Sequence, residues 1–303
     1  MQRASGRHVL TVDLEEYFQV EAFSDVVQRD HWESYPSRVE SSARILLDLL
    51  DAADATATFF VVGWLAQRHG ALLREIAHRG HEIACHSFWH RLVYELTPRE
   101  FEADALLAKE VIEQETGCAV QGYRAPSFSI TEDSLWALDV LAQCGFTYDS
   151  SIFPIHHDIY GMPAAPRRPF VAGRGSLAVC PMTTFRWCGH NWPVGGGAYL
   201  RLMPWWYTAM GIGRAERQGI PVVGYIHPWE LDPDQPRIRG RIRSGVRHYT
   251  NLTKTKRRLS RLLALARFSS FSKSRLIDAI PHPTPPPLRD QAFRVGSWLP
   301  VIK

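Results

Sequence analysis

The chain has 303 residues, of which 45% are hydrophobic and 22% charged, the balance of an ordinary globular protein. A chain of this length can bury a sizeable core without disulfide support. Its five cysteines form no CxxC pair, and an odd number cannot close into disulfides within one chain. This cysteine usage favours a reducing compartment.

The amino terminus lacks the pattern of a secretory signal. Residues 1–8 are polar, and the apolar run from Val9 to Val12 stops at Asp13. No stretch of the sequence approaches the roughly 20 apolar residues of a transmembrane helix. We therefore expect a cytoplasmic protein without a transmembrane segment.

The net charge of +4 hides an uneven distribution of charge. Thirteen Lys and Arg residues and no Asp or Glu lie between Arg237 and Arg275, so the rest of the chain is acidic. Such a segment could bind nucleic acid, anionic lipid or an acidic polymer. No nucleic-acid-binding module is recognisable, so we expect no nucleic-acid partner. We interpret the segment as a solvated face that docks on the acidic remainder.

Strand-like and helix-like segments alternate over the first two-thirds of the chain. Alternation of this kind predicts an α/β fold with a parallel sheet covered by helices. A distorted (β/α) barrel is the favoured closure, and an open doubly wound sheet is the alternative. The predicted strands are His8–Asp13, Ala57–Val62, Glu82–His86, Val120–Tyr123, Phe146–Asp149, Leu177–Pro181 and Pro221–His227, and the predicted helices are Gly63–His69, Ala71–Arg79, Thr97–Gly117 and Thr131–Gly145.

The sequence changes character after His227. A turn-rich acidic segment leads into the basic stretch, where a leucine pattern beginning near Asn251 predicts one more amphipathic helix. Pro281–Pro287 cannot be helical and is expected to be extended. We therefore expect a catalytic domain over residues 1–228 and a basic extension over residues 229–303.

Residues able to do chemistry gather at the predicted carboxyl ends of strands, where parallel α/β folds build their active sites. Asp13 and Glu15 follow the first strand, and carboxylates at i and i+2 of an extended segment point to the same side. One could bind a metal while the other acts as a base. His86 and His90 form an HxxxH pair, which converges if the intervening turn is helical.

Three further strand ends carry candidate residues. Arg124 could grip a carboxylate with two parallel hydrogen bonds, and Pro126 fixes the loop that carries it. Asp149 ends another strand. His227 is followed at once by Pro and Trp, which places it at the mouth of a cavity rather than in a core.

The order of these clusters resembles the polysaccharide deacetylase family, the NodB-homology, carbohydrate esterase type. The resemblance spans roughly residues 8–228. Within it, VDLEEYF, YRAPSFS, YDSSIFP and the later RHYTNL are similar to the branch associated with bacterial exopolysaccharide and exosortase (PEP-CTERM) systems. The common family motif has two adjacent aspartates, whereas Leu14 follows Asp13 here. The third metal ligand therefore maps onto Glu15, with Glu16 as the fallback.

The resemblance implies a hydrolase that removes N-acetyl groups from an N-acetylated polysaccharide or oligosaccharide. Glu15, His86 and His90 would hold one divalent ion, with Zn²⁺ favoured over Co²⁺ or Ni²⁺. Asp13 would be the base and His227 the acid. Arg124 would hold Asp13, and Asp149 would orient His227.

Secondary roles follow from the same resemblance. The backbone N–H near Ser127 would support the oxyanion, and Trp229 with one of Trp187 or Trp192 would lie near the sugar. Two other interpretations stay open. One is amide hydrolysis on a small molecule such as a ureide, and the other is a catalytically silent sugar-binding module, because Leu14 breaks the usual motif.

Overall fold

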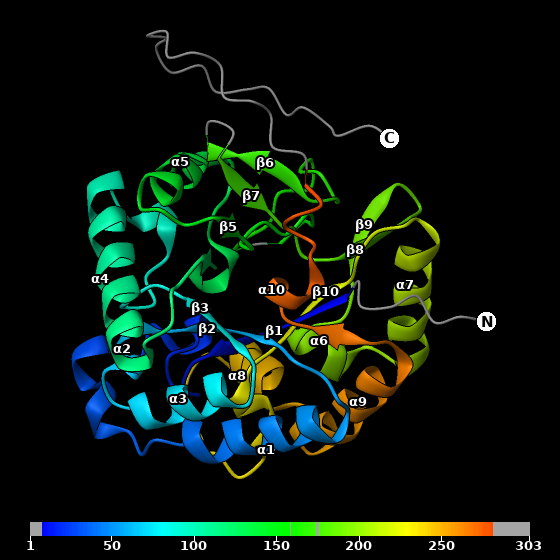
Figure 1. The fold of residues 1–303 in the computed structure, drawn as a ribbon. Coiled ribbons are helices and arrows are strands. Elements are labelled where there is room, and N and C mark those ends of the chain that lie inside the picture. Colours follow the sequence, from blue (N-terminus) through cyan, green and yellow to red (C-terminus); the bar gives the residue numbers. More distant parts are fainter. Residues whose placement is uncertain (1–7, 158, 174–175, 281–303) are drawn as a thin grey trace, which may run out of the picture.

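The computed structural model describes residues 8–157, 159–173 and 176–280. In these residues one curled sheet of nine strands forms the centre of the molecule, with helices on its outer side (Figure 1). The sheet has the order β10-β1-β2-β3-β4-β5-β7-β6, and β11 pairs with β1. Its strands are β1 (His8–Leu14), β2 (Thr58–Val61), β3 (Glu82–Cys85), β4 (Gly122–Tyr123), β5 (Tyr148–Asp149), β6 (Phe170–Ala172), β7 (Leu177–Val179), β10 (Val223–Ile226) and β11 (Phe268–Ser269).

Every pairing along this order is parallel except the one between β6 and β7. The predicted α/β class and parallel sheet are confirmed, and the sheet curls into a half barrel. Each predicted strand is present, most of them shorter than expected. The carboxyl ends of β1, β2, β3 and β10 meet at one edge, because parallel strands share their direction.

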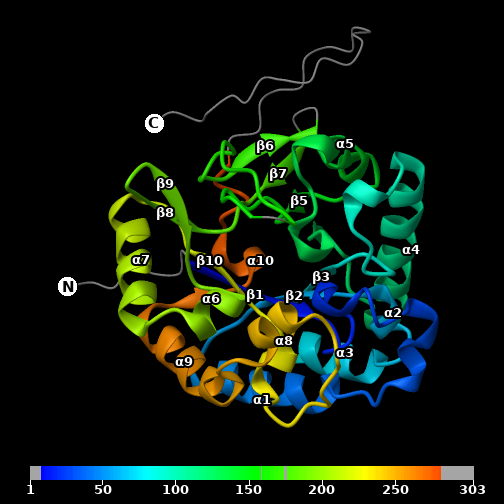
Figure 2. The same cartoon turned by 180° about the vertical axis from the view of Figure 1, so that it is seen from behind.

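Helices surround the sheet, as Figures 1 and 2 show from opposite sides. The predicted helix after Thr97 is present: its capping box uses Glu100, and Gly117 ends it at φ 68°. Among the described residues, the α-helices are α1 (Val39–Ala52), α2 (Gly63–Ala66), α3 (Gly70–His78), α4 (Pro98–Thr116), α5 (Trp136–Gln143), α6 (Gly197–Leu202), α7 (Trp205–Arg217), α8 (Ile242–Tyr249), α9 (Leu252–Leu265) and α10 (Phe271–Ser274).

Several elements lack a clear signal in the sequence. One is a two-stranded hairpin of β8 (Thr184–Trp187) and β9 (His190–Pro193), which turns at Cys188 and Gly189, both with positive φ. Helices α1, α6, α7, α8 and α10 also went unpredicted, whereas the helix expected near Asn251 is α9. The predicted extended segment at Pro281–Pro287 lies outside the described residues.

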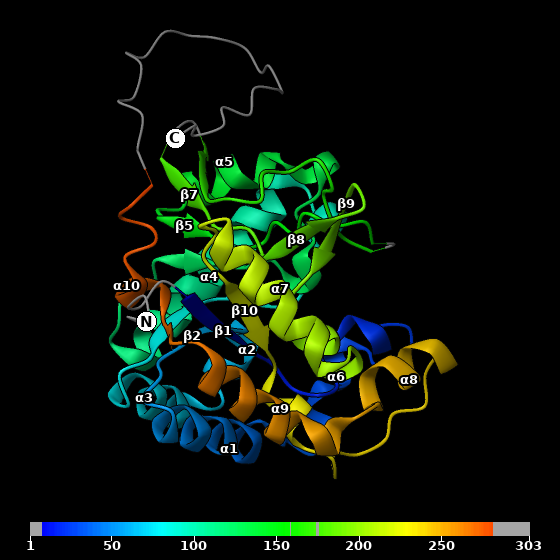
Figure 3. The same cartoon turned by 90° about the vertical axis from the view of Figure 1, so that its right-hand side faces the viewer.

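The segment after Pro228 is built into the same body as the sheet. Strand β11 pairs with β1 at His8 and Val9, so the two ends of the described chain lie side by side. Figure 3 shows α8 and α9 on the side of the molecule that also carries α6. Among the described residues, no helix has both the length and the apolar character needed to cross a membrane.

Candidate active site

Successive side chains at the end of β1 point alternately into a cavity and into the hydrophobic core. Asp13 and Glu15 line a cavity of about 250 Å³ at the carboxyl edge of the sheet, and both are almost fully buried. Leu14, between them, packs in the hydrophobic core. The residue that departs from the family's aspartate pair therefore fills a core position, and the cavity still receives two carboxylates.

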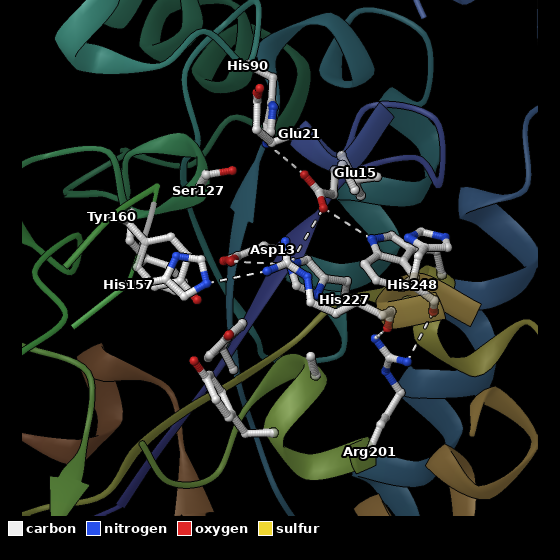
Figure 4. A pocket seen from close by; sticks show the side chains of 18 of the residues that line it. Asp13, Glu15, Glu21, His90, Ser127, His157, Tyr160, Arg201, His227 and His248 are labelled. Carbon is white, nitrogen blue, oxygen red and sulfur yellow. Dashed lines mark hydrogen bonds and ion pairs between the residues drawn. The ribbon is translucent and has the colours of Figure 1, made fainter. Parts of the chain in front are cut away.

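Glu15 lies with the two histidines of the HxxxH pair. One ligand-type atom from each of Glu15, His86 and His90 lies within 4.8 Å of the others. Oε2 of Glu15 is 2.8 Å from Nε2 of His90, and Oε1 accepts a hydrogen bond of 3.1 Å from the indole N–H of Trp229. Figure 4 shows Glu15 between the side of the cavity that carries His90 and the side that carries His227.

The histidine loop is not helical, contrary to the geometry that the HxxxH spacing suggested. His86 and His90 converge because the backbone turns at Ser87 (φ 66°) and His90 (φ 51°), two residues in the left-handed region. The carboxylate of Asp104, on α4, accepts hydrogen bonds from two amides of the loop, Phe88 N–H at 2.9 Å and Trp89 N–H at 3.2 Å. A buried carboxylate thus holds the turn that brings the two rings together.

The protonation states in this cluster suit a divalent cation. Burial lowers the pKa of His86 to about 4, so its ring is neutral. Its Nδ1 is 2.8 Å from the carbonyl oxygen of Arg124, an arrangement in which Nδ1–H donates and Nε2 is the ligating atom. Burial raises the pKa of Glu15, but its interactions with His90, His227 and His86 together outweigh burial and lower it to about 2. A neutral imidazole and an ionised carboxylate are the donor types that Zn²⁺ takes.

Glu16, the fallback ligand, lies elsewhere. Its carboxylate accepts hydrogen bonds from the N–H groups of Arg38 (3.0 Å) and Val39 (3.1 Å) and from the hydroxyl of Ser37. These groups stand at the start of α1, so Glu16 satisfies free N–H groups at a helix amino terminus.

Arg124 contacts Asp13, as the sequence predicted. Nη1 of Arg124 lies 2.7 Å from Oδ1 of Asp13 and 2.7 Å from the hydroxyl oxygen of Thr11. Its Nε donates to the carbonyl of Ser150 at 3.0 Å, and the side chain is fully buried. The guanidinium thus fixes one oxygen of Asp13 and leaves Oδ2 facing the cavity, where His227 Nε2 lies 3.8 Å away.

His227 joins the same cluster from the end of β10. Its Nε2 is 3.5 Å from Oε1 of Glu15, and its Nδ1 is 2.8 Å from Oε1 of Glu230. Burial lowers the pKa of His227, but the hydrogen bond to Glu230 and the charges of Glu15, Glu230 and Asp13 together raise it to about 9. The structure therefore holds a protonated imidazole beside Asp13.

Within the described residues, His227 is oriented by Glu230 and not by Asp149. The carboxylate of Asp149 accepts hydrogen bonds from the N–H (2.9 Å) and the hydroxyl of Ser151. In the part of the chain that the structure describes, this carboxylate makes no hydrogen bond or ion pair with His227, whose carboxylate partners are Asp13, Glu15 and Glu230. Burial raises the pKa of Asp149 to about 6. The predicted contact between Asp149 and His227 was wrong.

Glu230 was missed although the sequence carries a signal for it. Glu at the third position after His227, with Pro between them, is the spacing of a capping box, and the structure forms that box. Its second oxygen lies 2.5 Å from Nε of Arg201, and both side chains are 1% exposed. Arg201 also donates to the carbonyls at the end of α8, those of Arg247, His248 and Thr250.

The remaining candidates divide between the cavity and the surface. Ser127 lines the cavity with a left-handed backbone (φ 50°), and Trp229 lines it with its ring stacked between those of His227 (4.9 Å) and His248 (4.1 Å). Trp187 and Trp192 stand on the β8–β9 hairpin, are 46% and 37% exposed, and do not line this cavity.

Two known family models match the part of the chain that carries most of these residues. Residues 32–148 match the polysaccharide deacetylase family, and residues 150–275 match a domain of unknown function, DUF3473. The chain therefore contains a polysaccharide deacetylase domain over residues 32–148. The first match contains His86, His90 and Arg124, and the second contains His227 and Glu230.

Two curated bacterial relatives match about a third of the chain. A peptidoglycan-N-acetylglucosamine deacetylase of Bacillus cereus is 28% identical over 31% of the chain and 34% of its own length. A peptidoglycan deacetylase of Helicobacter pylori is 31% identical over 37% of the chain and 37% of its own length. The alignments thus span about a third of these relatives. A crystal structure of a Mycobacterium smegmatis protein described as a candidate polysaccharide deacetylase has the same fold, with a TM-score of 0.54 at 20% identity over 97% of this chain and 98% of that one.

Proposed function

We propose that the protein is a metal-dependent hydrolase that removes N-acetyl groups from an N-acetylated polysaccharide. The observation that carries this proposal is the convergence of five side chains on one cavity: Asp13, Glu15, His86, His90 and His227. The polysaccharide deacetylase domain and the names of the two bacterial relatives support the same activity. A sugar-binding module would need neither a paired base nor a paired acid.

Glu15, His86 and His90 would hold one divalent cation, and Zn²⁺ is the expected ion because two imidazoles and one carboxylate leave a position open for catalysis. Co²⁺ or Ni²⁺ would accept the same ligand types. When bound, the cation supplies Lewis acidity to the acetamide carbonyl and to water. Asp104 and the Arg124 carbonyl keep the two imidazoles in place for it.

The chain's own residues supply the proton transfers. Asp13 takes a proton from the attacking water through its free oxygen, while Arg124 holds the other oxygen. His227, held protonated by Glu230, gives its proton to the departing amine nitrogen, which leaves poorly without one. One water is consumed, the carbon–nitrogen bond breaks, and the products are acetate and an amino sugar.

Ser127 and Trp229 complete the site in this proposal. Ser127 lines the cavity with a left-handed backbone, and a backbone N–H near it is the donor that we expect to stabilise the developing oxyanion. Trp229 fixes Glu15 through its indole N–H, and its ring, stacked between those of His227 and His248, forms part of the cavity wall beside the acid.

An exopolysaccharide is the substrate that the sequence resemblance favours. The DUF3473 match, over residues 150–275, contains the motif RHYTNL and all of YDSSIFP except Tyr148 and Asp149. The division into a catalytic domain (1–228) and an extension (229–303) stays a prediction. The contacts of Arg201 with Glu230 and with the end of α8 suggest that the extension supports the catalytic histidine.

Acetate release tests the proposal. The purified protein is incubated with N-acetylglucosamine oligosaccharides, with and without added Zn²⁺, and with small ureides in parallel. We expect acetate from the oligosaccharides, dependent on the metal, and no hydrolysis of ureides. Hydrolysis of ureides alone would replace the substrate class, and no hydrolysis of either by metal-loaded protein would favour the sugar-binding module.

A further inference from the structure

The cavity has a cationic wall that the reaction does not use. Arg247, on α8, and His157, after β5, both line it, and Nη1 of Arg247 donates to Nε2 of His157 at 3.3 Å. Among the described residues, no carboxylate lies within ion-pair distance of Arg247. A guanidinium is always charged and has five N–H donors, so most of its binding capacity remains open to a ligand.

Arg247 differs in this from other cations of the basic segment. Arg241 pairs with Asp25 at 2.7 Å, and Arg258 donates to the carbonyls of Leu200 and Met203. These contacts fit the predicted role of a face that docks on the rest of the chain. Arg247 instead places its positive charge in the cavity wall. Docking of the basic segment on the rest of the chain does not require a charge at this position.

Among the described residues, none of the carboxylates that line the cavity forms an ion pair with Arg247. Asp13 is bound by Arg124, Glu15 contacts His90, and Glu21 accepts a hydrogen bond from the hydroxyl of Ser24. Beside Arg247, Arg241 and Arg243 are also exposed, and the segment from Arg237 to Arg275 contains no Asp or Glu.

The partner of Arg247 is held rigidly. The ring of His157 stacks on that of Tyr160 with centroids 3.8 Å apart and an angle of 8° between the planes. Tyr160 also lines the cavity, and Figure 4 shows the two rings together on the side away from His248. This wall therefore offers flat rings for a sugar and a cation for an anionic substituent.

We propose that Arg247, His157 and Tyr160 form a subsite for an acidic sugar, so that the substrate is a polysaccharide in which a carboxylate-bearing sugar such as a uronate neighbours the N-acetylated residue. The proposal rests on the deacetylase function and adds its substrate class. The planar guanidinium can donate two parallel N–H···O hydrogen bonds to a carboxylate. A neutral sugar has no carboxylate to accept this pair of bonds.

The test compares two tetrasaccharides as substrates of the metal-loaded protein. One contains N-acetylglucosamine alone, and the other alternates N-acetylglucosamine with glucuronate. We expect kcat/KM to be at least about 10-fold higher for the acidic one, because charge-assisted hydrogen bonds are about twice as strong as neutral ones. Arg247→Gln should remove most of this preference, and Arg247→Lys should retain part of it.

Arg257→Gln is the matched control, because Arg257 is exposed on α9 and does not line the cavity. It should leave the acidic-to-neutral ratio unchanged. Equal kcat/KM for the two tetrasaccharides, or a preference that survives Arg247→Gln, would overturn the subsite while leaving the deacetylase function intact. Absence of acetate from both would instead contradict the deacetylase function. Calorimetric binding of the same tetrasaccharides then decides the subsite without turnover: equal affinities, or an acidic preference that Arg247→Gln does not reduce, would overturn it.

Discussion

His227 and Glu230 face each other across 2.8 Å, from imidazole Nδ1 to carboxylate Oε1, at the end of β10. The carboxylate fixes the ring so that Nε2 points at Asp13 and Glu15. This pairing takes the place of the one expected with Asp149. It also connects His227, through Glu230 and Arg201, to the end of α8.

Replacing Glu230 should change the pH dependence of the reaction. A general acid works while it is protonated, so activity is lost as the pH rises through the pKa of His227. Glu230 raises that pKa, and Glu230→Gln should therefore move the alkaline limb of kcat/KM to lower pH. The variant also leaves Arg201 buried without a charge partner, at a cost of about 3–5 kcal/mol in stability.

The double variant Arg201→Met, Glu230→Gln separates the two effects. It removes the buried pair together, so stability should recover relative to Glu230→Gln while the alkaline limb stays at low pH. A pH profile that matches the native one in both variants would mean that Glu230 does not tune His227.

Asp13→Asn tests the base. An amide cannot accept the proton of the attacking water, so turnover should fall by about 10²–10⁴. Metal content should stay near that of the native protein, because Asp13 is not among the three ligand-type residues. Measured turnover within tenfold of the native value, at unchanged metal content, would assign the base to another residue.

Glu15 and Glu16 are neighbours with separable roles. Glu15→Ala should lower metal occupancy. Glu16→Ala should leave occupancy nearly intact and lower the free energy of unfolding by about 0.5–2 kcal/mol, the usual effect of losing a helix cap. Metal analysis and chemical denaturation of both variants check this, and the reverse pattern would move the ligand to Glu16.

The part of the site that lies at strand ends could be predicted, because the period of the strand fixes which side chains share a face. Asp13, Glu15, the histidine pair and the contact of Arg124 with Asp13 followed from that rule and from the family resemblance. Glu230 and Asp104 could not be found in this way. Asp104 sits in the middle of α4, where a carboxylate ordinarily faces solvent, and only the packing of the histidine loop on that helix gives it buried partners.

Asp104 should act through the loop that it holds. Asp104→Ala removes the acceptor for two loop amides, so the turn between His86 and His90 loosens. We expect metal affinity to fall by about 10- to 100-fold, as for other residues that position metal ligands. Equilibrium dialysis against Zn²⁺ measures this, and Glu102→Ala, on the exposed side of the same helix, should have native affinity.

His81 should make stability sensitive to acid. Burial lowers its folded pKa from 6.5 to about 4, and its Nδ1 accepts the N–H of Ala57 at 3.2 Å. The unfolded chain takes up this proton first as the pH falls. The contribution of neutral His81 is therefore complete above pH 6.5 and is lost progressively toward pH 4. His81→Gln, which keeps an acceptor for Ala57, should flatten the fall of unfolding free energy over that range, and an unchanged slope would show that His81 is not the group responsible.

Chelation and restoration test the central claim most directly. Protein stripped of metal by a chelator and dialysed is assayed for acetate release from N-acetylglucosamine oligosaccharides, before and after one equivalent of Zn²⁺ is returned. The account predicts activity near background in the stripped protein, recovery on addition of Zn²⁺, and no recovery in His86→Ala or His90→Ala. Full activity in the stripped, metal-free protein would contradict it.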